Sequence, residues 1–159
     1  MPRESEVVLA SDRTSVTSVF RADRYHQLAS TGVEESLAAQ LADVQARGWS
    51  AMIDGFADPE YRALVIDDDL VAGAVIGGGT RRRIAWIGVH PAQRRRGYGR
   101  AVLAAICAEA DRDQMILDLQ VERTNLGAIA LYAEAGFSAA GPDQSTDLFL
   151  AREPRRSAS

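Results

Sequence analysis

The order of hydrophobic and polar residues predicts helices in the first third of the chain. A short apolar run at residues 7–10 is expected to begin a sheet, and residues 14–28 have weak helical periodicity. Residues 33–47 are predicted to form a firmer helix, which Gly48 is expected to end. The apolar positions that recur along this helix are Leu37, Leu41 and Val44.

The middle of the chain is richer in strand-forming residues. Residues 63–66 and 70–76, joined by three aspartates, predict a hairpin, and residues 84–89 predict a third strand. The period then changes to that of a helix at residues 99–111. The core face of this helix is formed by Val102, Ile106 and Ala110, with Leu103 and Cys107 beside them.

The last third predicts a strand, a helix and two more strands. Residues 115–121 alternate between apolar and polar side chains, as a half-buried strand does. A helix is expected at residues 125–135, with Asn125 as its N-cap and Gly136 just past its end. The two final strands are expected at residues 137–140 and 147–152.

The composition indicates one globular domain without a membrane segment. With 159 residues, 47% of them hydrophobic, the chain is expected to form one domain over residues 1–153, followed by a disordered tail at residues 154–159. There is no apolar run of about 18 residues. The single cysteine, Cys107, allows no intrachain disulfide, so a reducing cytoplasm is the expected location. No metal site is expected, because only two histidines accompany that cysteine.

The charge is unevenly distributed along the chain. The net charge of −4 and the pI of about 5.2 disfavour nucleic-acid binding. However, seven arginines lie between Arg81 and Arg100, which suggests a local anion site; a solvated loop is the alternative. The absence of lysine, together with many alanines, is typical of a GC-rich bacterial genome.

The segment from Val89 to Ala101 has the features of a phosphate-binding loop. A strand leads into a glycine-bearing loop and the loop into a helix, so N–H groups at the helix start face outward. Gly97 and Gly99 allow the main chain to approach phosphate oxygens closely. The segment is not a P-loop, because the chain has no lysine. It is not a dinucleotide fingerprint either, because Val102 stands where a third glycine is required.

This segment resembles the pyrophosphate loop of the GCN5-related N-acetyltransferase (GNAT) family. Residues 94–99, Arg-Arg-Arg-Gly-Tyr-Gly, match the family signature Q/R-x-x-G-x-G/A, and the family's usual valine and proline stand at Val89 and Pro91. Residues 125–137 resemble a later family motif, N-x-x-A-x-x-L-Y-x-x-x-G-F, at every fixed position. The two motifs follow in the family's order, and the resemblance covers residues 63–152.

The resemblance implies an α/β (α+β) fold. The family has a mixed, mostly antiparallel sheet of six to seven strands flanked by about four helices, with two central strands splayed apart. It uses acetyl-CoA, whose pantetheine arm lies in the gap between these strands. Main-chain groups of Ile87, Gly88 and Val89 would then contact the pantetheine and thioester, and one N–H would stabilise the oxyanion. Gly88 would ease a local bulge, or is simply a small residue packed under Trp86 or a helix.

The resemblance also implies which residues bind the diphosphate and protonate the leaving group. The diphosphate would rest mainly on main-chain amides of Arg94, Arg95, Arg96, Gly97, Tyr98, Gly99, Arg100 and Ala101. Asn125 would hydrogen-bond the cofactor, or only cap its helix. Tyr132 would contact the cofactor and act as the general acid, because a phenol held against the sulfur can protonate the departing thiolate. The alternative is a half-buried tyrosine whose hydroxyl is satisfied.

The general base is the least defined part of the predicted site. Some family members use a glutamate five residues before the motif asparagine, but Gln120 stands there. Glu122 is the catalytic residue that we assign in its place, and Asp118 shares its strand face. Trp86, His90 and a chain of water molecules remain alternatives.

The sequence thus predicts an N-acetyltransferase that acts by direct attack in a ternary complex. The acceptor would be a primary amine of a small molecule or peptide, and a homodimer is left open. An inactive acetyl-CoA-binding sensor or scaffold is the second interpretation. The third is an anion-binding or nucleic-acid-binding adaptor that uses residues 81–96.

Overall fold

The fold comes from a computed structural model of the chain, which describes residues 6–8, 12–79, 81–94, 96–141 and 146–156. Within these ranges, one sheet contains β1 (Glu6–Val8), β2 (Glu60–Ile66), β3 (Asp69–Gly77), β4 (Arg82–Val89), β5 (Leu117–Glu122), β6 (Ser138–Ala139) and β7 (Asp147–Arg152). The helices are α1 (Arg13–Ser30), α2 (Glu35–Ile53), α3 (Tyr98–Asp113), α4 (Leu126–Glu134) and the short 3-10 helix η1 (Pro91–Gln93). The predicted order of strands and helices is confirmed.

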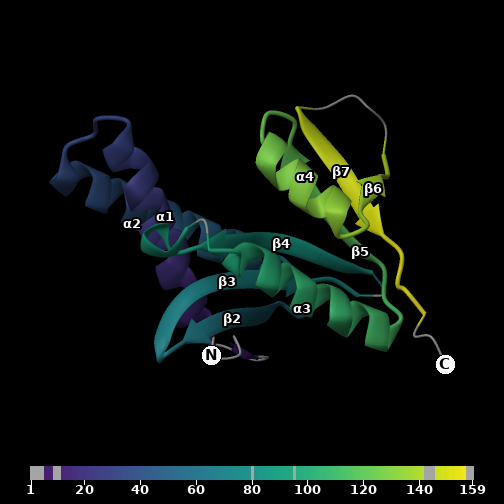
Figure 1. Cartoon of the computed structure of the whole chain (residues 1–159). Helices are drawn as coiled ribbons and strands as arrows, with labels where there is room; N and C mark the ends of the chain where they lie inside the picture. The colour runs from purple at the N-terminus through teal and green to yellow at the C-terminus, as the bar shows by residue number, and fades with distance from the viewer. Residues whose placement is uncertain (1–5, 9–11, 80, 95, 142–145, 157–159) are drawn as a thin grey trace.

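The sheet is mixed and opens between its two central strands. Its strand order is β1-β2-β3-β4-β5-β7-β6, and every neighbouring pair is antiparallel except β4 and β5. That parallel pair shares only Arg82 with Leu117 and Arg83 with Asp118. Beyond these residues β5, β7 and α4 turn away from β4 (Figure 1). The predicted fold class, including the splayed strands, is therefore confirmed.

The bulge in β4 lies at Ala85 and not at Gly88. The register of β3 and β4 slips there, because Ile84 and Trp86 pair with consecutive residues of β3 and Ala85 is left over. The structure supports the alternative explanation for Gly88, since a Cβ there would lie 2.1 Å from the Trp86 ring. A bulge bends and twists its strand, and this one lies where β4 parts from β5.

The helices form layers on both faces of the sheet (Figure 1). On one face α1 packs on β3, where the Val16 side chain would meet a Cβ at Gly73 at 3.3 Å. Phe20 of α1 stacks on Trp49 of α2 with ring centroids 4.4 Å apart, and Trp86 meets both rings edge-on. On the other face α3 and α4 cover the larger core cluster. Aromatic packing therefore fixes α1 beside the open part of β4.

The predicted end of α2 was wrong, and the apolar residues that recur along it do not form its buried face. Leu37 and Val44 are 48% and 54% exposed, and the helix continues through Gly48 to Ile53. The buried positions are Ala38, Ala42, Ala46, Trp49 and Ile53. Small alanines let α2 lie close to α1, and burial of Trp49 and Ile53 outweighs the cost of about 1 kcal/mol for a helical glycine.

The buried arginine Arg152 links strand β7 to helix α3. Arg152 of β7 is 3% exposed and donates to both carboxylate oxygens of Asp111 in α3, at 2.8 and 3.1 Å. The main-chain N–H of Arg155 donates to the same carboxylate at 2.7 Å. Residues 157–159 of the predicted tail lie outside the described residues.

Among the helices of the described ranges, none is both long and apolar enough to cross a bilayer.

Candidate functional site

Main-chain groups of β4 face the gap that β5 leaves. His90 donates its N–H to the Val71 carbonyl of β3 at 2.8 Å. Because successive residues of a strand direct their main-chain groups to opposite sides, Gly88 also faces β3, whereas Ile87 and Val89 face the gap. Ile87 and Val89 can therefore hydrogen-bond an extended ligand that lies along β4. Gly88, the third residue predicted to contact the cofactor, uses its main-chain groups within the sheet.

The start of α3 presents main-chain amides that no side chain caps. Gly97 precedes the helix with a φ of 79°, a left-handed conformation that disfavours other residues. The first i→i−4 bond runs from the Ala101 N–H to the Gly97 carbonyl at 3.0 Å, so the Ala101 amide is used within the helix. The amides of Tyr98, Gly99 and Arg100 precede that bond and lie at the positive end of the helix dipole. An anion is the natural partner of such a group of amides.

The arginine side chains of the loop are largely engaged within the protein. Arg94 pairs with Asp23 of α1, and Arg96 donates to the Gln93 side chain at 3.1 Å. Arg100 pairs with Glu134 of α4 at 2.5 Å. Arg95 lies outside the described residues. These pairings are consistent with a diphosphate that is bound more by amides than by guanidinium groups.

A cavity of about 390 Å³ occupies the gap between β4, β5, α4 and α1. Of the predicted site residues, it brings together Ile87, Glu122, Asn125 and Tyr132. Its other lining residues are Arg24, Gln27, Ile84, Ala85, Trp86, Leu119, Gln120, Val121 and Ala128. The predicted diphosphate residues of the loop do not line it. A ligand bound at both places would therefore run from the start of α3 into this gap.

Tyr132, the predicted general acid, lines the cavity with a half-buried side chain. Its ring packs edge-on against Phe137 with centroids 5.7 Å apart, and burial raises the pKa of its phenol above the ordinary value. No described residue hydrogen-bonds its hydroxyl. The alternative of a half-buried tyrosine with a satisfied hydroxyl therefore has no support among the described residues. A phenol that remains protonated in alkaline solution can donate its proton to a ligand in the cavity.

Asn125 caps α4 and also lines the cavity. Its Oδ1 accepts the Ala128 N–H at 3.2 Å, which satisfies one of the free amides at the start of α4. The Nδ2 group has no partner among the described residues and is a donor for a ligand. The two roles proposed for Asn125, capping and ligand binding, are thus compatible.

Glu122 is the only carboxylate that lines the cavity among the described residues. Its side chain forms no ion pair with any described residue, and it is exposed. Asp118, the other candidate on this strand face, is bound to Arg83 at 2.9 Å and Arg81 at 3.6 Å. The His90 Nδ1 accepts the Ala92 N–H at 3.2 Å, and the Trp86 indole is a donor only. The geometry therefore favours Glu122, alone or through water, as the base.

Two residues of α1 that sequence reasoning missed also line the cavity. The Arg24 guanidinium carbon lies 4.9 Å from the Phe20 ring centroid, and its Nη1 donates to the Gln27 side chain at 3.1 Å. The signal in the sequence was weak. Phe20, Arg24 and Gln27 share one side of a helix by their i, i+4, i+7 spacing, but nothing in that pattern indicates what the side faces.

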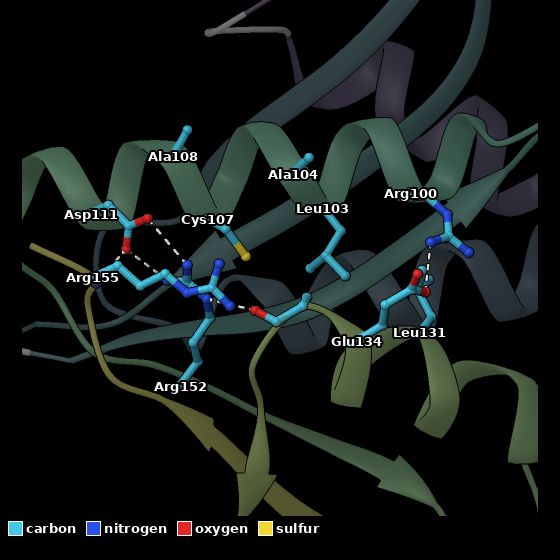
Figure 2. Close-up of a pocket in the computed structure, with 11 residues that line it drawn as sticks. Arg100, Leu103, Ala104, Cys107, Ala108, Asp111, Leu131, Glu134, Arg152 and Arg155 are labelled. Carbon is cyan, nitrogen blue, oxygen red and sulfur yellow. Dashed lines mark hydrogen bonds and ion pairs between the residues drawn. The ribbon is translucent and has the colours of Figure 1, made fainter. Parts of the chain in front are cut away.

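A second cavity, of about 300 Å³, lies between α3, α4 and the end of β7 (Figure 2). Small and apolar side chains line its middle, and the Arg100–Glu134 pair and the Asp111–Arg152 pair stand at its two ends. Cys107 points into it, but burial raises the pKa of this thiol, which makes it a poor nucleophile. Neither Tyr132 nor Glu122 lines this cavity, so it contains none of the predicted catalytic residues.

Comparison with known proteins identifies the domain. Residues 25–137 match the family model described as the acetyltransferase (GNAT) family. The match begins within α1, well before the two motifs, and ends at Phe137. No curated protein matches the sequence significantly.

Several solved structures have the same fold. PaiA N-acetyltransferase from Thermoplasma acidophilum, in complex with coenzyme A, is 13% identical with a TM-score of 0.68, over 94% of this chain and 99% of that chain. The Escherichia coli ribosomal-protein-S18-alanine N-acetyltransferase is 18% identical with a TM-score of 0.68, over 97% and 96%. Ard1 from Thermoplasma volcanium is 19% identical with a TM-score of 0.62, over 96% and 99%. At these identities the likeness establishes the fold.

Proposed function

We propose that this chain, which belongs to the acetyltransferase (GNAT) family, is an acetyl-CoA-dependent N-acetyltransferase that acts on a primary amine. The observation that carries the proposal is the gap between β4 and β5. Main-chain groups of Ile87 and Val89 that face away from β3 border it, and Tyr132 and Glu122 line the cavity within it. The neighbour from Thermoplasma acidophilum was solved with coenzyme A, which supports the choice of cofactor.

The chain offers groups for the diphosphate, the pantetheine and the thioester of acetyl-CoA. The diphosphate would bind the amides of Tyr98, Gly99 and Arg100, and the pantetheine would pair with β4 as an added strand. The N–H of Ile87 or Val89 would donate to the thioester oxygen, which becomes an oxyanion in the tetrahedral intermediate. The acetyl group would then lie in the cavity, next to the α1 side of the gap.

The transfer requires that the amine nitrogen lose a proton and that the departing thiolate gain one. The neutral amine attacks the thioester carbonyl, forming the C–N bond, and collapse of the intermediate breaks the C–S bond. Glu122, directly or through water, accepts the proton that the attacking nitrogen loses and releases it to solvent. Tyr132 gives its proton to the departing thiolate, so coenzyme A leaves as a thiol. Tyr132 recovers a proton from solvent before the next turnover.

Titration with acetyl-CoA followed by a thiol-release screen over amine classes tests this function. We expect acetyl-CoA to raise the melting temperature and at least one amine to cause release of free thiol. Binding without thiol release for any amine would leave an acetyl-CoA sensor or scaffold instead. Absence of any binding would contradict both interpretations.

A further inference from the structure

Two opposite charges line the cavity without partners of opposite charge. Arg24 stands on the α1 side and Glu122 on the β5 side, and they form no ion pair with each other. Within the described part of the chain, neither has any other ion-pair partner. Every other lining residue is neutral at pH 7. The cavity therefore presents one cation and one anion to whatever binds there.

The neighbours of Arg24 hold its side chain without neutralising its charge. The neighbouring carboxylate on α1, Asp23, is bound to Arg94 of the loop and accepts a hydrogen bond from Gln27. Gln27 in turn accepts from Arg24, a neutral contact that leaves the guanidinium charge uncompensated. The guanidinium also lies over the Phe20 ring, a cation–π contact that favours this position of the side chain. A guanidinium held in this way binds carboxylates well, because two of its N–H groups can donate together.

We infer that the acceptor carries a carboxylate as well as its amine, as a free amino acid does. This inference rests on the proposed N-acetyltransferase function. Arg24 would bind the acceptor's carboxylate, and Glu122 would bind the ammonium group, take its proton and release that proton to solvent before the neutral amine attacks. Arg24 is thus a specificity-determining residue, and the amino acid's two charges match the two unpaired charges of the cavity.

Other acceptor classes match this cavity less well. A polyamine has several cationic groups, of which only one would meet Glu122 while another faced Arg24. A protein N-terminus or a lysine side chain has no carboxylate beside the amine. The cavity volume of about 390 Å³ lies at the small end of the range of roughly 300–1,000 Å³ for ligand pockets. The acetyl group would take up part of this volume, which favours a small acceptor, and a zwitterion matches the two charges.

The test compares an amino acid with its own carboxamide, for example phenylalanine with phenylalaninamide. The two acceptors share their skeleton and differ in the carboxylate that Arg24 would bind. We expect the wild-type kcat/KM to favour the amino acid by roughly tenfold or more, the usual effect of a charge-assisted hydrogen bond. Arg24→Gln should abolish this preference, mainly through a higher KM for the amino acid, and Arg24→Lys should keep part of it. Arg21→Gln is the matched control, because Arg21 lies on α1 but pairs with Asp43 at 2.8 Å outside the cavity.

Equal kcat/KM values for acid and carboxamide, or a preference that survives Arg24→Gln, would overturn the inference while leaving the acetyltransferase function intact. If no acceptor causes thiol release, the proposed function fails and calorimetry on the protein with bound coenzyme A decides. Amino-acid binding that Arg24→Gln weakens would support the carboxylate site. Absence of such binding would overturn it.

Discussion

Arg83 donates to Asp118 at 2.9 Å at the last residue pair that β4 and β5 share. Arg81 approaches the same carboxylate, so two arginines and one aspartate stand where the strands begin to part. These ion pairs lie at the end of the gap where β4 and β5 are still paired, and the cavity begins with the next residues, Ile84 and Leu119. Asp118 is thus engaged in ion pairs, whereas Glu122 on the same strand face pairs with no described residue.

The two carboxylates of β5 should therefore differ in their effect on catalysis. Glu122→Gln is expected to lower kcat/KM at neutral pH by roughly a hundredfold, the usual minimum for loss of a general base. Asp118→Asn should change kcat/KM by less than about threefold, while lowering the free energy of unfolding by about 0.5–1 kcal/mol. Steady-state kinetics and denaturant titrations of both variants check this. A larger kinetic loss in Asp118→Asn than in Glu122→Gln would contradict the assignment.

Tyr132→Phe should lower kcat by roughly a hundredfold or more and leave the acetyl-CoA dissociation constant unchanged. The phenyl ring keeps the contact with Phe137, and only the proton donor is lost. Because burial raises the Tyr132 pKa above about 10, the acid stays protonated at lower pH. In the wild type, kcat/KM should therefore rise as the acceptor amine loses its proton, with no decline below pH 10. A decline that begins near neutral pH would argue against Tyr132 as the acid.

The sequence predicted the helices and strands whose ends are marked by capping residues or glycines. Asn125 caps α4 and Gly136 follows its end with a φ of 103°, as expected. The glycine loop was found because its function requires specific residues in a short segment. The buried face of α2 could not be found in the same way. Leu37 and Val44 are more hydrophobic than the alanines of this helix, yet they are exposed and the alanines pack against α1. Close helix packing selects small residues, and periodicity weighted by hydrophobicity misses them.

The charges of the cavity could not be assigned from the sequence for a different reason. Arg24 and Glu122 are 98 positions apart in the chain, and the open end of the sheet brings them to one cavity. Nothing local distinguishes Arg24 from Arg21, which faces α2 instead. Likewise, the bulge at Ala85 depends on pairing with β3, which a single strand's sequence does not specify.

Gly97 and Gly99 should respond differently to replacement by alanine. Gly97→Ala places a side chain at a φ of 79°, which costs about 1–2 kcal/mol and turns the following amides away from the ligand. We expect lower stability and a severalfold weaker acetyl-CoA affinity. Gly99 lies within α3, and a Cβ there would meet Val89 at an ordinary 3.4 Å. Gly99→Ala, the matched control, should be as stable as the wild type or more so, as thermal melts and calorimetry would reveal. Equal acetyl-CoA affinities for both variants would contradict the assignment of the diphosphate site to this loop.

Asp111→Asn should destabilise the protein by about 1–3 kcal/mol, because it leaves the buried Arg152 without its charged partner. The Arg152 hydrogen bonds hold the pKa of Asp111 below its ordinary value, so this stability is present above about pH 4. It is lost as pH falls through the lowered pKa, and the difference between wild type and variant should then shrink. Urea titrations across pH check this. Glu134→Gln, at an exposed pair, is the control and should cost less than about 1 kcal/mol.

Amide hydrogen exchange with and without acetyl-CoA tests the central claim most directly. We predict that the ligand slows exchange at Tyr98, Gly99 and Arg100 and at Ile87 or Val89. Exchange around the second cavity, between α3 and α4, should change little, at Cys107 for instance. Slower exchange confined to that cavity, with no change at the start of α3 or along β4, would contradict the account.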